Sequence, residues 1–320
     1  LKKHLLECLK FLKKINLFNM NHILIAGGTG FIGHHVAYKY KKKGWKVTSI
    51  SLTKPQKKRY IQGVKYLLID LTKKNKILKT LNKKFTHVVN LSGYTSNLYS
   101  TKLKKKIHDS HYYSTKNLID FFINKKIKNF IQIGSSAEYG DAKSPLKEEK
   151  KCRPLNVYGR AKHKASMYAL ASAKKHKFPV NVLRLFQVYG PGQGENRAVM
   201  QILKFCLNKE QFPASNGKQV RDFCFIDDVI RAIDLIFKKN ISGELINIAN
   251  GKGVTMKKLI LTIKKVAKGG EPQFGLFKSR NHENPNLVPS IDLAKKLLKW
   301  KPKTTLEEGL KITRKSINAR

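Results

Sequence analysis

The chain has 320 residues, of which 41% are hydrophobic, enough to bury the core of one large α/β domain with a smaller appended lobe. No apolar run approaches the roughly 20 residues that a membrane-spanning helix needs, so no membrane span is predicted. The four cysteines have neither CxxC spacing nor the density of a disulfide framework, and the ten histidines form no HExxH motif or Cys/His cluster. We therefore expect a cytoplasmic protein without a metal site.

The charge balance is strongly basic, with 66 Lys and Arg against 20 Asp and Glu and a formal net charge of +46. Such a surface attracts polyanions through counterion release. Only 10 of the 66 basic residues are arginine, however, and the lysines are scattered along the whole chain. An A/T-rich coding sequence, in which lysine codons are frequent, accounts for this pattern, so no specific nucleic-acid partner is predicted. A scaffold that binds polyanions through its lysines is the alternative from another functional class.

In chain order, residues 1–19 come first, as an N-terminal extension before Met20, which directly precedes the first predicted strand. Apolar residues recur there at helical spacing between lysines, a pattern that also suits a helix lying on a membrane surface. The segment lacks the arginine and serine content of a transit peptide and the uninterrupted apolar core of a secretory signal.

From Met20 onward, short apolar runs alternate with longer polar and apolar segments, the pattern of a parallel sheet flanked by helices. The predicted fold is α/β, with a doubly wound parallel (Rossmann) sheet. Strands are expected at 22–26, 46–51, 65–69, 87–91, 129–134 and 180–185. Helices are expected at 32–42, 102–124 and 157–176.

The same pattern divides the chain into two parts. Residues 20–190 are predicted to form the dinucleotide-binding Rossmann domain, and residues 191–320 to form mainly a smaller C-terminal substrate-binding lobe that is partly interleaved with the first. Beyond Pro191 the regularity fades into loop signals, among them 212–217 and 269–272.

A glycine-rich turn follows the first predicted strand. Gly27, Gly30 and Gly33 fall where a tight turn, a close backbone approach and helix-on-strand packing each exclude a side chain. Phe31 and Ile32 lie at the start of the following helix, where backbone N–H groups meet an anion. The turn therefore predicts a cradle for the pyrophosphate of a dinucleotide cofactor.

Three further residues predict acid–base chemistry. Tyr158 and Lys162 are four residues apart on a predicted helix, so their side chains project from one face. A nearby ammonium and a positive nicotinamide ring favour the phenolate form of a tyrosine, which then exchanges a proton with a sugar hydroxyl. Ser135 follows a predicted strand at the carboxyl edge of the sheet, where its hydroxyl is placed to hold the substrate oxygen beside Tyr158.

With these motifs, residues 20–314 resemble the extended short-chain dehydrogenase/reductases of the nucleotide-sugar epimerase, reductase and dehydratase family. The motifs that carry the resemblance are GGTGFIG at 27–33, DL at 70–71, GSSAEYG at 134–140, YGRAK at 158–162, RLFQVYGPG at 184–192 and RDFCFIDDV at 221–229.

The resemblance implies a role for each matched residue. Asp70, with Leu71, contacts the adenine; Ser135 and Tyr158 handle the proton; and Lys162 grips the nicotinamide ribose. The implied substrate is a nucleoside-diphosphate sugar, and the implied assembly is a homodimer through 102–124 and 157–176. The residues assigned to substrate binding are Ser136, Gln187, Arg221 and Arg280, the two arginines as a clamp on the diphosphate.

Departures from the family pattern narrow the prediction. Dehydratases of the family carry an acidic residue at the position of Ala137, so 4,6-dehydration is disfavoured and redox chemistry at C4 remains, either as a 4-epimerase or as a 4-ketoreductase. Enzymes that prefer NAD commonly end the second strand with an aspartate, whereas this chain has Ser51 followed by a basic cluster. This difference favours NADP over NAD. Gln187 replaces the usual asparagine, and the nucleotide and sugar stay open.

Overall fold

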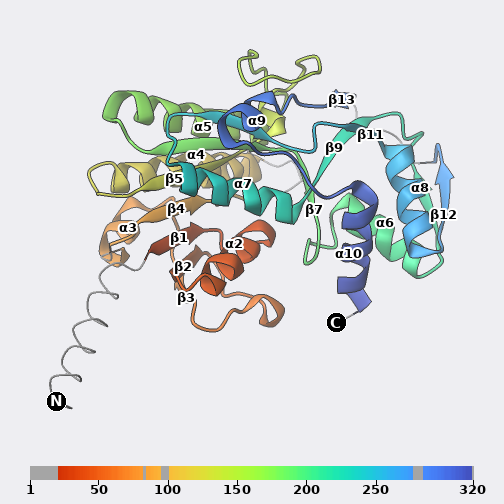
Figure 1. The fold of residues 1–320 in the computed structure, drawn as a ribbon, viewed down its shortest axis with the longest axis horizontal. Helices are drawn as coiled ribbons and strands as arrows, with labels where there is room; N and C mark the ends of the chain where they lie inside the picture. Colours follow the sequence, from red (N-terminus) through yellow and green to blue (C-terminus); the bar gives the residue numbers. More distant parts are fainter. Residues whose placement is uncertain (1–20, 82–83, 95–100, 277–283, 319–320) are drawn as a thin grey trace.

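The computed structural model describes residues 21–81, 84–94, 101–276 and 284–318 (Figure 1). The predicted extension 1–19 therefore lies outside the described residues. Within them, the main sheet has seven parallel strands in the order β10-β6-β5-β4-β1-β2-β3. Its strands are β1 (His22–Ala26), β2 (Lys46–Ser51), β3 (Lys65–Leu68), β4 (His87–Asn90), β5 (Asn129–Ser135), β6 (Val180–Leu185) and β10 (Leu245–Ile248).

This order confirms the doubly wound α/β prediction. All six predicted strands form, each within one residue of its expected bounds, and the strand order reverses between β1 and β4. In folds of this kind, ligands bind at that switch point, beyond the carboxyl ends of the strands. The seventh strand, β10, was not predicted, because four residues between Gly243 and Asn250 are too short to show a pattern and its place beside β6 is set by tertiary packing.

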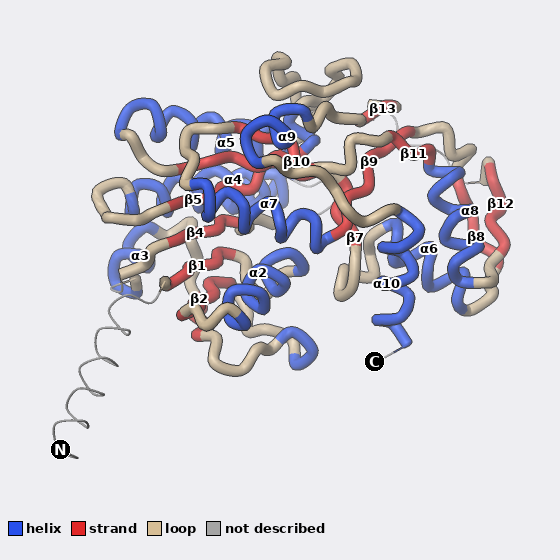
Figure 2. Tube along the Cα trace, viewed as in Figure 1, coloured by secondary structure: helices blue, strands red, loops and turns tan. Residues whose placement is uncertain are grey.

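Helices cover both faces of the main sheet (Figures 1 and 2). Alternate residues of each strand point to opposite faces, so Ile23 and Ile25 join one core cluster while Leu24 and Ala26 join the other. The first cluster includes side chains of α2 (Phe31–Lys42) and α7 (Ile226–Lys239). The second includes side chains of α3 (Lys74–Thr80), α4 (Thr101–Phe122) and α5 (Val157–His176). Two short 3-10 helices, η1 (Lys57–Arg59) and η2 (Ser136–Glu138), follow β2 and β5.

The C-terminal part of the chain forms a second group of elements, at the right of Figure 1. A small sheet has the order β11-β9-β13 with β7 paired to β9, and β12 pairs with β8. The four-stranded sheet consists of β7 (Gln187–Tyr189), β9 (Val220–Phe225), β11 (Gly253–Thr255) and β13 (Asn286–Leu287). The separate two-stranded sheet consists of β8 (Gln211–Ala214) and β12 (Glu271–Phe274). The helices of this group are α6 (Ala198–Leu207), α8 (Met256–Ala267) and α10 (Leu306–Asn318). The remaining helix after residue 190 besides α7, α9 (Asp292–Leu298), packs instead against β10 and α7 of the main sheet.

Two loop predictions in this part are correct only in part: residues 215–217 and 269–270 lie outside strands, whereas 212–214 and 271–272 belong to β8 and β12. Ranges 212–217 and 269–272 contain the proline and glycine that indicate loops, yet β8 and β12 pair there in parallel, with Pro272 opposite Phe212 and Gln273 opposite Pro213. Proline lacks a backbone N–H but is tolerated in a strand whose N–H side has no partner strand, as in this two-stranded sheet. Among the described residues, no helix is both long and apolar enough to cross a membrane.

Candidate active site

The glycine-rich turn joins β1 to α2 with no room for side chains. Gly27 has φ +80°, and a Cβ placed there would lie 2.9 Å from the Leu91 carbonyl oxygen at the end of β4. A Cβ on Gly33 would lie 2.2 Å from the Gly27 carbonyl oxygen, whereas one on Gly30 would lie 3.1 Å from the same atom. The first turn of α2, with Phe31 and Ile32, thus opens at the switch point of the sheet, where its free N–H groups suit a pyrophosphate.

β2 ends in the hydroxyl side chain of Ser51, at the position where NAD-preferring enzymes commonly have an aspartate. The Ser51 Oγ accepts a hydrogen bond from the Thr29 hydroxyl at 2.9 Å. Arg59 lies beside it and donates to the carbonyl oxygens of Thr29 at 3.0 Å and Gly192 at 2.8 Å. These two bonds connect the glycine turn to the segment after β7.

Asp70 and Leu71 lie in the turn after β3. The Asp70 carboxylate accepts hydrogen bonds from the backbone N–H of Thr72 at 2.9 Å and from its hydroxyl at 2.7 Å, while the Leu71 side chain is buried. Asn117 on α4 donates to the Leu71 carbonyl oxygen at 3.0 Å. The turn is therefore held in place against α4.

The start of α5 is pressed against η2, and this contact brings two predicted residues together. The Asn156 side chain caps α5 by accepting from the Gly159 N–H at 2.8 Å, and a Cβ on Gly159 would lie 2.4 Å from the Ala137 carbonyl oxygen. Tyr158 therefore lies next to the end of β5. Burial raises the pKa of the Tyr158 phenol, while the Ser135 side chain, through a hydrogen bond, acts in the opposite direction.

Lys162 lies one turn further along α5 and is buried. Its Nζ donates a hydrogen bond to the Ile133 carbonyl oxygen of β5 at 2.8 Å. Burial lowers the Lys162 pKa to about 8, against the Glu138 carboxylate, which raises it. The ammonium is therefore largely charged at neutral pH. The structure thus gathers Ser135, Tyr158 and Lys162 at the carboxyl edge of β5.

The predicted substrate-binding residues lie in different environments. Ser136 is buried in η2, Gln187 is exposed on β7, and Arg280 lies outside the described residues. Arg221 is largely buried in β9 and donates to the carbonyl oxygens of Val220 at 2.9 Å and Pro285 at 3.2 Å. Those bonds fix the direction of the Arg221 side chain, and the arginine pair expected as a diphosphate clamp stays a prediction.

Residues 23–249 match the model of the NAD dependent epimerase/dehydratase family. The chain belongs to that family. The match covers the glycine turn, the end of β5 and the whole of α5, so the residues gathered at the switch point lie inside it.

Members of this family with known activities are similar over most of their length. UDP-glucuronate 4-epimerase of Thermodesulfobacterium geofontis is 25% identical over 321 residues, covering 92% of this chain and 95% of the relative. CDP-abequose synthase of Salmonella typhimurium is 25% identical, covering 92% and 97%. The solved structure of UDP-glucose 4-epimerase from Thermotoga maritima with UDP-glucose superposes with a TM-score of 0.87 at 27% identity, covering 93% and 99%.

Sequence reasoning missed two site residues in this member of the family. The His111 ring of α4 is buried and meets the Tyr158 ring edge-on, with centroids 5.1 Å apart. Burial holds the His111 pKa well below its usual value, so its ring is neutral there. The charge of Arg197, an exposed residue at the start of α6, acts against the burial that raises the Tyr158 pKa. Neither residue belongs to a motif, and only the fold brings them to Tyr158.

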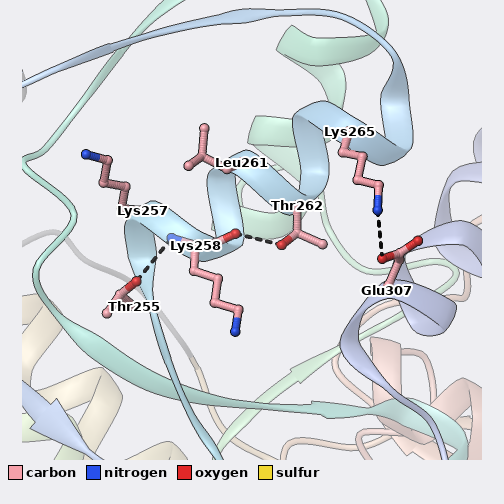
Figure 3. Close-up of a pocket in the computed structure, with 7 residues that line it drawn as sticks. All are labelled: Thr255, Lys257, Lys258, Leu261, Thr262, Lys265 and Glu307. Carbon is pink, nitrogen blue, oxygen red and sulfur yellow. Dashed lines mark hydrogen bonds and ion pairs between the residues drawn. The ribbon is translucent and has the colours of Figure 1, made fainter.

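A surface hollow of about 470 Å³ lies elsewhere, between α8 and α10 (Figure 3). It is lined by Thr255, Lys257, Lys258, Leu261, Thr262, Lys265 and Glu307. In the figure the Lys265 ammonium points to the Glu307 carboxylate, 3.5 Å away, and the other two lysines point outward. The predicted site residues are absent from its lining, so this hollow is separate from the candidate active site.

Proposed function

We propose that the protein catalyses oxidation and reduction at C4 of a nucleoside-diphosphate sugar, as a 4-epimerase or a 4-ketoreductase. The observation that carries this proposal is the position of Tyr158 beside Ser135 at the carboxyl end of β5, with the buried Lys162 ammonium one helical turn away. The named relatives act on UDP-, CDP- and related sugars, which supports this substrate class. Residues 191–320 are proposed to supply most of the sugar-nucleotide contacts.

The residues divide the proposed reaction between them. A nicotinamide cofactor, when bound, supplies or accepts the hydride at the sugar carbon. Tyr158 takes the proton of the C4 hydroxyl during oxidation and returns it during reduction, and the Ser135 hydroxyl holds the same oxygen. The Lys162 ammonium favours the phenolate by its charge and is placed to grip the nicotinamide ribose.

A neighbouring carboxylate bears on the dehydratase alternative. Ala137 has no acid to offer, and the adjacent Glu138 is fully buried with its Oε2 accepting from the Arg184 Nε at 3.0 Å. A carboxylate held in that way does not reach a substrate. Its direction therefore supports redox chemistry at C4 over elimination of water.

For the cofactor, we propose that NADP is accepted at the end of β2. The hydroxyl of Ser51 and the guanidinium of Arg59 replace the negative charge that would repel a 2′-phosphate. Two observations weigh on the side of NAD: the family is NAD dependent, and a solved UDP-glucuronic acid 4-epimerase from Bacillus cereus, 25% identical with a TM-score of 0.85, contains NAD. Mass analysis of the cofactor released from denatured protein decides the matter. Retained NAD indicates an epimerase, and loosely held NADPH indicates a ketoreductase.

The substrate class is tested by thermal stabilisation with UDP-, GDP-, CDP- and dTDP-sugars, because selective binding to the native state raises the melting temperature. We expect one nucleotide to stabilise the protein clearly more than the other three at equal concentration. Equal or absent stabilisation by all four, in the presence of cofactor, would contradict the proposal.

A homodimer through α4 and α5 is proposed as the assembly, in the cytoplasm. The two helices pack side by side against the sheet, and Tyr113 on α4 and Met167 on α5 are 43% and 42% exposed. Exposed large apolar side chains on adjacent helices suit an interface. Sedimentation equilibrium is expected to give a dimer that Met167→Glu weakens, and a monomeric wild-type protein would overturn this proposal.

A further inference from the structure

A buried carboxylate lies directly beneath the candidate active site. Glu138, the last residue of η2, has no solvent exposure. Its Oε1 accepts hydrogen bonds from the Ser135 N–H at 2.7 Å and from the Ser166 hydroxyl at 3.0 Å. Its Oε2 accepts from the Arg184 Nε at 3.0 Å. A Cβ on Gly134 would lie only 2.6 Å from Oε1, so the glycine of β5 leaves the space that the carboxylate fills.

These bonds connect three elements that build the site. Ser135 closes β5, Arg184 belongs to β6, and Ser166 lies on α5 one turn after Lys162. The Ser135 hydroxyl also accepts from the Ala137 N–H at 3.2 Å, so serine and glutamate form a reciprocal capping box around η2. The orientation of the Ser135 backbone therefore depends on the Glu138 carboxylate.

We propose that Glu138 is a positioning residue for the reaction proposed above: it fixes Ser135 against the start of α5 and keeps the Lys162 ammonium charged. This inference rests on the proposed function, because Glu138 acts through the residues proposed for the reaction, Ser135, Tyr158 and Lys162.

Electrostatic interactions support the proposal that Glu138 keeps the Lys162 ammonium charged. The Glu138 charge raises the Lys162 pKa against the effect of burial, and it raises the Tyr158 pKa as well. Burial alone would raise the Glu138 pKa, but His163, Arg184 and the Ser135 N–H outweigh it and lower that pKa, so the carboxylate is ionised at neutral pH.

Other titratable groups face the same carboxylate and its arginine. His163 on α5 has its Nδ1 3.9 Å from Glu138 Oε2, and the Arg184 guanidinium lies 4.5 Å from the centre of the Tyr139 ring. Cys152 and Glu148 precede α5 and interact with Arg184, and burial raises the pKa of both. Among these groups, Glu138 is the carboxylate whose charge acts on Lys162.

Without the Glu138 charge, the ammonium of Lys162 loses a favourable neighbour, so its pKa falls below about 8. The affinity for a dinucleotide whose ribose is held by the Lys162 ammonium then declines at a lower pH than it does when Glu138 is charged.

The experiment measures NADH and NADPH affinity by nicotinamide fluorescence across pH, which needs no sugar substrate. For the wild type, we expect affinity to decline with a midpoint near the Lys162 pKa, and Glu138→Gln to move that midpoint down by about one pH unit. Glu138→Asp keeps the charge and is expected to restore the wild-type midpoint. An unchanged midpoint in Glu138→Gln would overturn the proposal.

A matched control separates charge from packing. Ser166→Ala removes a hydrogen bond to Glu138 Oε1 but leaves the carboxylate in place, so its midpoint is expected to equal that of the wild type. If Glu138→Gln fails to fold because Arg184 is left unpaired, the double variant Glu138→Gln/Arg184→Gln removes both charges. Its midpoint is also expected to fall by about one unit, and a wild-type midpoint there would contradict the role of Glu138.

Turnover measurements test the proposal that Glu138 fixes Ser135 in position. With an active sugar nucleotide, Glu138→Gln is expected to lower kcat about tenfold or more with little change in KM, since Ser135 acts on the reacting oxygen. A loss of kcat in Ser166→Ala equal to the loss in Glu138→Gln would indicate general loosening of the site and would contradict the positioning role of Glu138. If no sugar nucleotide reacts with the wild type, the proposed function fails, while the NADH and NADPH titration still decides the charge effect of Glu138.

Discussion

Two fully buried carboxylates, one in each part of the molecule, have contrasting partners. Glu138, beneath the end of β5, is bonded by the side chains of Arg184 and Ser166 as well as by a backbone N–H. Asp222, in β9, accepts from the backbone N–H groups of residues 250, 251 and 252 at 2.6, 2.6 and 3.1 Å. Side-chain donors therefore compensate most of the buried Glu138 charge, whereas backbone N–H groups alone face the Asp222 carboxylate in these bonds.

The pKa directions differ in the same way. A guanidinium and a histidine beside Glu138 overcome burial and lower its pKa, whereas burial raises the pKa of Asp222 to about 6 in spite of its three N–H donors. The neighbouring groups decide whether a buried acid supplies charge to its surroundings. Glu138 does so for Lys162, while Asp222 holds a loop.

The largest expected effect is on turnover. Tyr158→Phe removes the group that exchanges the proton and should lower kcat by about 10²- to 10⁴-fold, with the melting temperature nearly unchanged. Tyr168→Phe, on the same helix but bonded to Asp120, is the matched control and is expected to retain turnover. Steady-state kinetics on the active sugar nucleotide checks both, and a fully active Tyr158→Phe would exclude the proposed role.

The next largest effect is on the pH dependence of the free energy of unfolding, which should differ between the two carboxylates. The Asp222 pKa is about 6 in the folded protein and 3.8 in its ordinary state, so the native state retains a proton that the unfolded chain has released. Its contribution is present below about pH 4, and the free energy of unfolding falls by roughly 3 kcal/mol as pH rises through 6. Asp222→Asn should abolish that slope, as measured by urea unfolding at several pH values.

Glu138 is expected to show the opposite slope. Its folded pKa lies below its ordinary 4.5, so its stabilisation is present above that pH and is lost as pH falls through the folded value. The stability difference between wild type and Glu138→Gln should therefore shrink toward acid pH. If the two substitutions gave slopes of the same sign, the contrast between the two regions would be wrong.

A smaller effect is expected at the glycine turn. Gly33→Ala places a Cβ 2.2 Å from the Gly27 carbonyl oxygen and should cost about 1–3 kcal/mol in stability as well as weakening dinucleotide binding. Gly30→Ala meets the same atom at 3.1 Å, so we expect weaker binding with less loss of stability. Thermal melts and cofactor titrations compare the pair, and equal melting temperatures would contradict the packing argument.

The smallest effect concerns cofactor choice. Ser51→Asp adds a carboxylate that repels a 2′-phosphate and accepts from ribose hydroxyls, so the affinity ratio of NAD to NADP should rise by about tenfold, or roughly 1.4 kcal/mol. Thr53→Asp adds the same charge at an exposed position of the same loop and is expected to change the ratio less. Equal changes in the two variants would show that Ser51 does not face the 2′ position.

Much of the fold was predictable because its signals are local. The apolar runs of β1 to β6 stand between polar segments, and the span of α5 was predicted with its observed bounds. By contrast, β10 depends on pairing with β6, and β8 and β12 depend on each other across about 60 residues of sequence. Such distant pairings leave no periodic pattern in short segments.

The residues of the candidate site differ in the same way: some belong to local motifs, and others depend on neighbours that are distant in the sequence. Ser135, Tyr158 and Lys162 belong to motifs, and the fold places them together. The contribution of Glu138 was not predicted, because the sequence shows an acid next to Ala137 but not the arginine of β6 that turns it inward. The roles of sequence-distant neighbours thus require the assembled sheet.

The most direct test mixes the protein, loaded with oxidised cofactor, with sugar nucleotides that carry a C4 hydroxyl, and follows the absorbance of reduced nicotinamide. Both an epimerase and a ketoreductase acting in reverse should reduce the cofactor with one of these compounds. We predict reduction in the wild type and a loss of at least about 10²-fold in its rate in Tyr158→Phe. No reduction with any compound, or an equal rate in the two proteins, would contradict the assignment of the site.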